Sequence, residues 1–233
     1  MHVPDGFLDA PTSVATGVVA VAGVGLALRG ARRELDERTA PLAGLVAAFI
    51  FATQMINFPV GAGTSGHLLG GALAATLVGP WTGVLCVSVV LLVQGLLFAD
   101  GGLTALGTNI TLMALVGVGV AWLVVVALRA VLPKKQVSVI AASAVAALVS
   151  VPAAATVFTV LFAVGGVAQV PADKVLVAMV GWHTLIGIGE AVITSLVVAA
   201  VMSTRPDLVY AAKPLLRARQ DSLQIRPSEG VKA

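Results

Sequence analysis

Seven long, mostly apolar runs with almost no charged residues constrain the fold of this chain more than any other feature. They are residues 12–28, 41–57, 66–78, 82–98, 108–131, 137–163 and 175–202. Such runs suit helices that cross a bilayer, and they lack the ten-residue alternation of barrel strands. With 58% hydrophobic and 11% charged residues, the chain has too little polar surface to cover a soluble globule. The sequence therefore predicts an all-α membrane protein with seven transmembrane helices.

The third run, residues 66–78, is shorter than the roughly 17 residues of a full span. We expect it either to be extended by residues 61–65, or to lie in a thinned bilayer or a position buried by protein. It is counted as a span because the charge pattern requires an odd number of crossings.

That charge pattern also predicts the orientation. With the N-terminus outside, the inner side holds residues 29–38, 79–81, 132–136 and the chain after residue 202. These regions and their helix ends contain thirteen of the fourteen Lys and Arg residues, and only Lys174 remains outside. Positive residues collect on the cytoplasmic side of membrane proteins. We therefore expect the N-terminus outside and folded into the core, and the C-terminus in the cytoplasm.

Two parts of the chain differ in composition. Residues 1–204 form the expected membrane domain, and residues 205–233 are polar, contain three prolines and lack a sustained apolar period. We expect this tail to be a loosely ordered cytoplasmic extension. No basic stretch precedes a short apolar core and a cleavage site at the N-terminus, so the first run is expected to be retained.

The first residues of the chain could bind a metal ion. They read Met1-His2-Val3-Pro4-Asp5-Gly6, so a free amine, a backbone amide and an imidazole lie within two residues. These three nitrogens can close two fused chelate rings on one ion, a tetragonal arrangement that Ni(II) and Cu(II) favour. The alternative is a frayed terminal arm. Asp5 could anchor the arm without binding metal.

A fourth ligand could come from His67, which follows three glycines at the start of the third run. An ionisable group at membrane depth is a functional candidate, although His67 could also simply begin a helix beside the hydroxyls of Thr64 and Ser65. The cysteine count is one, which excludes a thiolate cluster, so any metal site must use nitrogen and oxygen ligands.

Several polar residues lie near the outer ends of the runs and could orient these ligands by hydrogen bonds. They are Asn57, Gln94 and Asn109, together with Thr64 and Ser65. Hydrogen bonding between helices is an equally good explanation for them. His183 and Glu190 are seven residues apart on one helix face, and we interpret them as a buried hydrogen-bonded pair.

Four separated stretches resemble the CbiM/NikM family, the substrate-capturing S components of cobalt and nickel energy-coupling-factor (ECF) transporters. The stretches are residues 1–7, 63–70, 96–107 and 182–190, and the similarity extends to about residue 202. The resemblance implies seven helices and a metal held by the Met1 amine, the His2 amide and imidazole, and the His67 imidazole. It also implies a T component, a pair of cytoplasmic ATPases and often a small accessory membrane subunit as partners.

The resemblance implies transport of Ni(II) or Co(II) without catalysis by this chain, since no Walker A motif is present. The Val-Pro-Asp of the opening favours the nickel type. One alternative is a membrane-embedded enzyme whose His2, His67 and His183 bind catalytic zinc, but the sequence has no His-Glu-x-x-His element. The other is a channel or secondary transporter, for which no inverted repeat is detectable.

Overall fold

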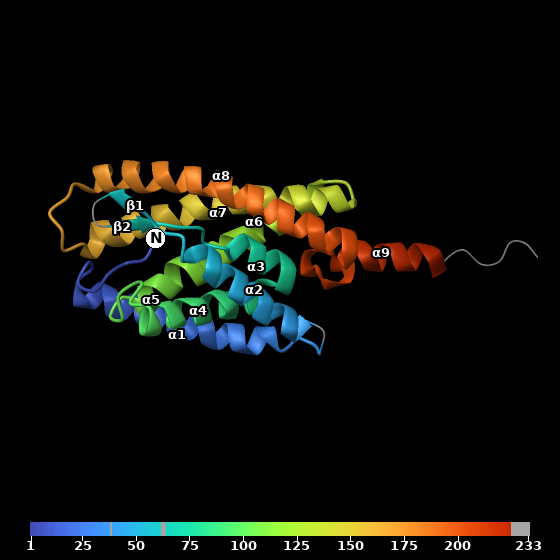
Figure 1. Ribbon diagram of the computed structural model, residues 1–233, viewed down its shortest axis with the longest axis horizontal. Coiled ribbons are helices and arrows are strands. Elements are labelled where there is room, and N and C mark those ends of the chain that lie inside the picture. The colour runs from blue at the N-terminus through green and yellow to red at the C-terminus, as the bar shows by residue number, and fades with distance from the viewer. Residues whose placement is uncertain (38, 62–63, 225–233) are drawn as a thin grey trace, which may run out of the picture.

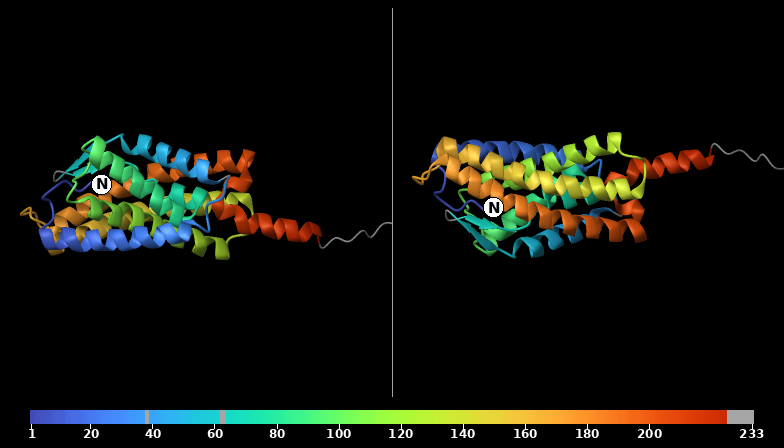
Figure 2. Two further views of the ribbon diagram at one scale, coloured as in Figure 1. Left: turned by 90° about the horizontal axis from the view of Figure 1, so that it is seen from below. Right: turned by 90° about the horizontal axis from the view of Figure 1, so that it is seen from above.

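The computed structural model describes residues 1–37, 39–61 and 64–224 of the chain. Five helical stretches in this part are long and apolar enough to cross a membrane. They are α1 (Ala10–Ala31), α4 (Pro80–Leu97), the continuous stretch Leu106–Val131, α7 (Gln136–Gly165) and α8 (Ala172–Thr204). The stretch Leu106–Val131 comprises α5 (Leu106–Asn109), the π-helix η1 (Ile110–Gly117) and α6 (Val118–Val131). All five lie along one bundle (Figures 1 and 2).

The two remaining predicted spans are shorter helices. Helix α2 (Thr39–Gln54) has 16 residues, and α3 (Gly71–Val78) has only 8, all of them buried. The protein-buried position considered for the third run is therefore the observed one. Length and composition support five spans directly, so the expected count of seven stays a prediction.

An unexpected hairpin precedes α3. Strands β1 (Phe58–Gly61) and β2 (Thr64–Gly66) pair antiparallel, and residues 67–70 then lead into α3 without helical structure. The predicted run 66–78 was thus wrong at its beginning. Because Gly70 has φ +77°, the chain turns sharply before α3 starts. This turn places His67 outside the helix that it was expected to begin.

The outward face of α1 is apolar, as expected of a helix that faces lipid. The helix exposes Val14, Val18 and Val21, whereas Thr12 and Thr16 are buried. Thr16 uses its buried hydroxyl to bond the Thr108 hydroxyl, with 2.7 Å between the oxygens. Apolar residues outside and small or polar residues between helices are the arrangement expected in a bilayer. The protein is accordingly a multi-pass membrane protein.

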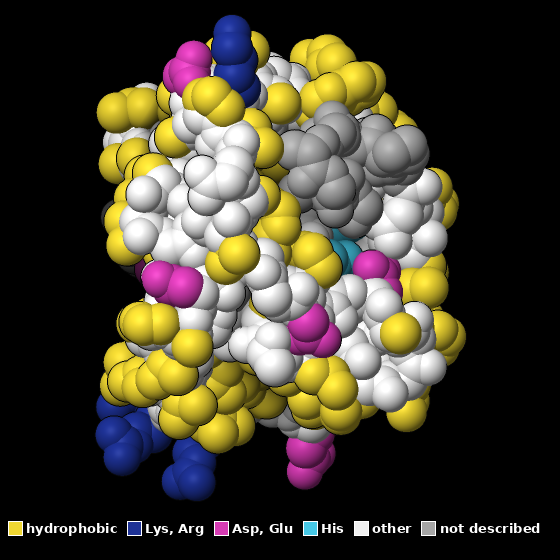
Figure 3. Space-filling model, turned by 90° about the vertical axis from the view of Figure 1, so that its left-hand side faces the viewer, with side chains coloured by type: hydrophobic (Ala, Val, Ile, Leu, Met, Phe, Trp, Pro, Cys, Tyr) yellow, Lys and Arg dark blue, Asp and Glu magenta, His cyan; other side chains and the backbone are white. Residues whose placement is uncertain are grey.

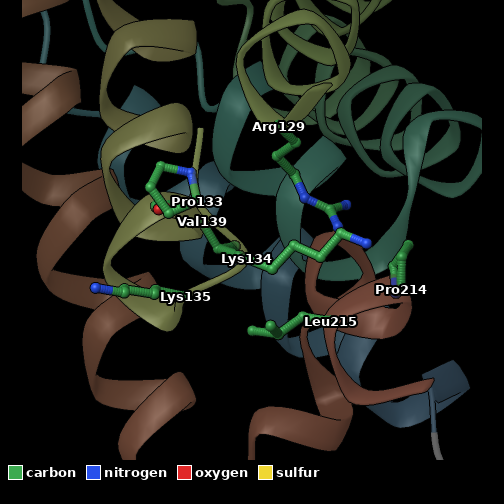
Figure 4. Close-up of a pocket in the computed structure, with 8 residues that line it drawn as sticks. Arg129, Pro133, Lys134, Lys135, Val139, Pro214 and Leu215 are labelled. Carbon is green, nitrogen blue, oxygen red and sulfur yellow. The ribbon is translucent and has the colours of Figure 1, made fainter. Parts of the chain in front are cut away.

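The tail is more ordered than predicted. Short helices η2 (Pro206–Leu208) and η3 (Tyr210–Ala212) fold back on the bundle, where Val209, Ala211 and Ala212 are fully buried, and α9 (Lys213–Gln224) follows. Apolar burial explains the order of residues 206–212. A pocket of about 190 Å³ lies beside α9, and the side chains of Arg129 and Lys134 converge at its wall (Figure 4).

Candidate metal centre

The N-terminal arm, residues 1–9, runs into the bundle and ends among β1, β2 and the surrounding helices (Figure 1). Met1 is 1% exposed and Val3 is completely buried. Asn109 holds the Val3 backbone on both sides. Its Oδ1 accepts from the Val3 N–H at 2.7 Å, and its Nδ2 donates to the Val3 carbonyl at 3.1 Å. The Gly102 N–H donates to the same carbonyl at 2.9 Å.

Further contacts anchor the arm nearer to α1. The Asp5 carboxylate accepts a hydrogen bond from the Thr104 N–H at 2.7 Å, and the bonds from Thr104 lower the pKa of Asp5. The Asp9 N–H donates to the Gly165 carbonyl at 2.7 Å, and the Asp9 side chain caps α1. The expected anchoring role of Asp5 is confirmed, and the arm is a fixed part of the core rather than a frayed end.

Two glycines make room for the arm. Gly101 has φ +91°, and a Cβ there would lie 3.3 Å from Cδ2 of His2 and 3.1 Å from Nδ2 of Asn109. A Cβ on Gly102 would collide with the backbone of Pro4 and Asp5. The loop after α4 can therefore cover the arm closely only because these positions lack side chains.

The Met1 amine is completely enclosed. Burial lowers its pKa to about 4, although the nearby Asp100 carboxylate acts in the opposite direction. Burial disfavours the charged form of an amine, so the group is neutral at pH 7. A neutral amine offers its lone pair as a metal ligand.

The two imidazoles predicted as ligands lie against each other. The rings of His2 and His67 stack with centroids 4.4 Å apart and planes 24° apart, although 65 positions separate them in the chain. Nε2 of His2 lies 3.2 Å from Oε1 of Gln94, and Nδ1 of His67 lies 2.8 Å from the Leu68 carbonyl oxygen. Because the Leu68 carbonyl is an acceptor, Nδ1 of His67 carries the proton. Both nitrogens of His2 lie against acceptors, Nε2 against Gln94 and Nδ1 against Asp100.

The other nitrogen of each ring is buried without a hydrogen-bond partner among the described residues. These atoms are Nε2 of His67 and Nδ1 of His2, although Nδ1 of His2 lies 3.0 Å from the Asp100 carboxylate. Buried polar atoms are nearly always hydrogen-bonded, so the orphaned lone pair of His67 beside a neutral amine calls for a ligand. Nδ1 is also the His2 nitrogen from which a six-membered ring through the His2 amide can close.

An acidic residue that sequence reasoning had not singled out as a site residue lies beside His2. Oδ1 of Asp100 is 3.0 Å from Nδ1 of His2, and Oδ2 accepts from Nδ2 of Asn57 at 2.9 Å. Partial burial raises the pKa of Asp100, but His2 and the Asn57 hydrogen bond outweigh this effect and lower it. Burial lowers the pKa of His2, and the charge of the Met1 amine lowers it further. The contacts with Asp100 and Gln94 raise the pKa of His2, but the lowering effects are larger.

The polar residues predicted to support the ligands are placed in different ways. Gln94 contacts His2 directly, Asn57 contacts it through Asp100, and Asn109 holds the arm backbone. The side chains of Thr64 and Ser65 lie outside the described part of the structure. Asp100 falls within residues 96–107, one of the four stretches used for the family resemblance, and this was the only signal for it.

His183 and Glu190 do not form the pair that the sequence suggested. Nδ1 of His183 lies 2.7 Å from the Met179 carbonyl oxygen of its own helix. Both carboxylate oxygens of Glu190 accept backbone N–H groups, from Leu69 and Gly70. His183 and Glu190 share a helix face, but each bonds a different stretch of backbone, because main-chain groups lie nearer to each side chain than the other side chain does.

The described residues contain no group of three or more His, Cys, Asp or Glu side chains that could hold a metal ion. A zinc enzyme built on His2, His67 and His183 therefore finds no support. The end of the bundle at which the arm enters carries acidic side chains and only a trace of histidine surface (Figure 3), in agreement with the 5% exposure of His2.

Known proteins of similar sequence are metal transporters. A putative metal transport protein of Haloquadratum walsbyi is 38% identical over 214 residues, which cover 90% of this chain and 94% of the relative. A putative fused nickel transport protein NikMN of Archaeoglobus fulgidus is 37% identical over 90% of this chain and 68% of its own length.

The fold has solved counterparts as well. A crystal structure of a transition metal transporter, 29% identical, superposes with a TM-score of 0.80 over 87% of this chain and 93% of the other. A truncated form, also 29% identical, gives 0.79 over 87% and 99%. The model of one protein family, described as the cobalt uptake substrate-specific transmembrane region, matches residues 2–208. The resemblance is confirmed, and the chain belongs to this family, CbiM, of nickel and cobalt transport membrane proteins.

Proposed function

We propose that this protein captures Ni(II) or Co(II) as the substrate-specific subunit of an ATP-driven ECF transporter, with nickel slightly preferred. The observation that carries the proposal is the set of free nitrogens at the end of the arm. A neutral buried amine, Nδ1 of His2 and Nε2 of His67 converge there; Nε2 of His67 has no protein partner in the described structure, and Nδ1 of His2 has only the Asp100 carboxylate beside it. The ligands are then Met1, His2 and His67, with the metal as transported substrate.

The fourth nitrogen is the His2 amide. No hydrogen bond from its N–H is found within the described residues, so deprotonation on metal binding would break none. A planar set of four nitrogens suits Ni(II) and excludes tetrahedral Zn(II) by geometry. Co(II) can use a similar set, and discrimination against Cu(II) rests on availability.

The proposed partners and topology follow from the family and the charges. The relatives named as fused nickel transport proteins join two components in one chain, which supports a partner beside this one. The partners that we propose for this chain in the ECF transporter are a T component, cytoplasmic ATPase subunits and, in some cases, a small accessory membrane subunit. In the proposed topology, α2 and α3 add two crossings to the five long helical stretches and make seven, and the N-terminal arm lies outside. The chain itself performs no catalysis.

The test is Ni(II) titration of the purified protein with its native N-terminus. Two variants accompany it, one with a single residue added before Met1 and one with His67→Ala. Both should lose tight stoichiometric binding, because the first converts the amine to an amide and the second removes a ligand. Tight binding by the extended protein would refute the chelate, and tight binding by His67→Ala would remove His67 from the proposed ligands.

A further inference from the structure

The chain around His67 is held by residues far away in the sequence. Leu69 and Gly70 precede α3, and their N–H groups have no intrahelical partner at the start of a helix. The Glu190 carboxylate from α8 accepts both, with Oε2 2.7 Å from the Leu69 nitrogen and Oε1 3.0 Å from the Gly70 nitrogen. Glu190 is 2% exposed.

A second residue holds the opposite side of the same segment. Nε2 of Gln54, from α2, donates to the Leu69 carbonyl at 2.7 Å, and Gln54 is completely buried. Residue 69 is therefore fixed through its N–H by one helix and through its carbonyl by another. Water cannot replace such bonds inside the bundle, so each is retained only if the protein supplies it.

One peptide group connects Glu190 to His67. The Leu69 N–H that Glu190 accepts and the Leu68 carbonyl that lies 2.8 Å from Nδ1 of His67 belong to the same peptide unit. That unit is planar, so fixing its N–H also fixes the direction of its carbonyl. A carboxylate on the N–H also polarises the carbonyl and strengthens it as an acceptor.

We infer that Glu190 is a positioning residue for metal capture, acting on His67 through the peptide between Leu68 and Leu69. It sets the orientation of the ring and keeps the proton on Nδ1, so that Nε2 points to the metal with its lone pair free. In metal sites a carboxylate often bonds the ligating imidazole directly. Here one peptide group lies between them. The inference rests on the proposed role of His67 as a ligand.

The chain contains a matched control. Glu34 is also a buried carboxylate, 3% exposed, that accepts two backbone N–H groups at the start of a helix. Its Oε2 lies 2.7 Å from the Thr82 nitrogen and its Oε1 lies 3.3 Å from the Trp81 nitrogen, at the N-terminus of α4. Glu34→Gln should therefore disturb folding in the same way as Glu190→Gln, without touching the segment that carries His67.

The experiment compares the two variants with the wild type by Ni(II) titration and by the d–d absorption of bound Ni(II). In Glu190→Gln one backbone N–H faces an amide NH₂ group, so the peptide should turn and the ring should move. We expect Ni(II) affinity to fall by about 10–100-fold and the absorption band to shift at saturating Ni(II). Glu34→Gln should keep the affinity and the band of the wild type. An unchanged Glu190→Gln, or an equal loss in Glu34→Gln, overturns the inference.

A measurement without metal separates this inference from the proposed function. Hydrogen exchange of the amides of Leu69 and Gly70 should be slow in the wild type and in Glu34→Gln, and at least tenfold faster in Glu190→Gln. Rapid exchange in the wild type would overturn the Glu190 contact even if Glu190→Gln failed to fold. Slow exchange in a wild-type protein that does not bind Ni(II) would instead refute the proposed function and, with it, the role of Glu190 in metal capture.

Discussion

Replacing Asn109 should release the N-terminal arm. Asn109 is 2% exposed and makes two hydrogen bonds to the Val3 backbone. In Asn109→Leu the Val3 carbonyl keeps the bond from the Gly102 N–H, but the Val3 N–H remains buried without an acceptor. Such an unsatisfied group costs about 1–3 kcal/mol. The undocked fraction of the arm should therefore rise by about 5–150-fold, since about 1.4 kcal/mol corresponds to a tenfold change.

The Met1 amine reports this equilibrium directly, because an acylating reagent can reach it only when the arm undocks. The labelling rate of the amine, followed by mass spectrometry and normalised to an exposed lysine, should rise by the same factor. Thr111→Val is the control, since it removes a buried hydrogen bond to the Thr16 carbonyl, 3.0 Å long, without touching the arm. Equal labelling of Asn109→Leu and wild type, or an equal rise in the control, would refute the reasoning.

Three further predictions concern the same site. At pH 6.5 the Met1 amine, with its pKa lowered to about 4 in the docked arm, is already neutral, whereas in a free peptide of residues 1–9 it is protonated. Calorimetry in buffers of different ionisation enthalpy should therefore show about one proton fewer released from the amine, and up to about half a proton fewer from His2, on Ni(II) binding by the protein than by the peptide, because the pKa of His2 is also lowered in the docked arm; equal counts would contradict a buried amine. Asp100→Asn removes a negative charge 3.0 Å from Nδ1 of His2 and should weaken Ni(II) binding about tenfold in titrations, so unchanged affinity would show that this carboxylate plays no part. Gly102→Ala should undock the arm and raise amine labelling, because its Cβ would meet the arm backbone, while Gly25→Ala has open space and should label as the wild type does.

Hydropathy located the helices well because a bilayer demands long apolar stretches regardless of detail. The predicted runs 12–28 and 137–163 lie within α1 and α7, and these helices extend one to three residues beyond the runs at each end. Hydropathy placed the start of the third helix too early, at residue 66, because the short buried helix α3 and the loop before it share the same apolar, glycine-rich composition. It also missed the folding of residues 206–212, where three small apolar side chains suffice to hold the turn against the bundle.

The site was predictable where covalent connectivity fixes the geometry. Met1 and His2 are adjacent, so the chelate proposed for them can be read from the sequence, and His67, whose ring stacks on His2, was placed with them by its expected side of the membrane. The contact of Asp100 with His2 and that of Glu190 with Leu69 depend on how segments 98 and 121 positions apart pack together. A single sequence does not show which residues so far apart in the chain come into contact. The interpretation of His183 with Glu190 failed for this reason, because spacing along one helix says nothing about the backbone that packs against it.

The π-helix η1 has a consequence for how this protein tolerates insertions and deletions. Its hydrogen bonds skip one residue more than those of an α-helix, so the stretch Ile110–Gly117 accommodates extra length without lengthening the helix as α-helical residues would. Loss of a single residue there would allow ordinary α-helix to form with Asn109 still in phase with α6. Loss of a single residue within α6 itself would instead rotate Asn109 by about 100° relative to the rest of that helix. Asn109 would then face away from Val3. The π-helical segment is therefore the part of this stretch where the loss of one residue leaves the contact between Asn109 and the arm intact.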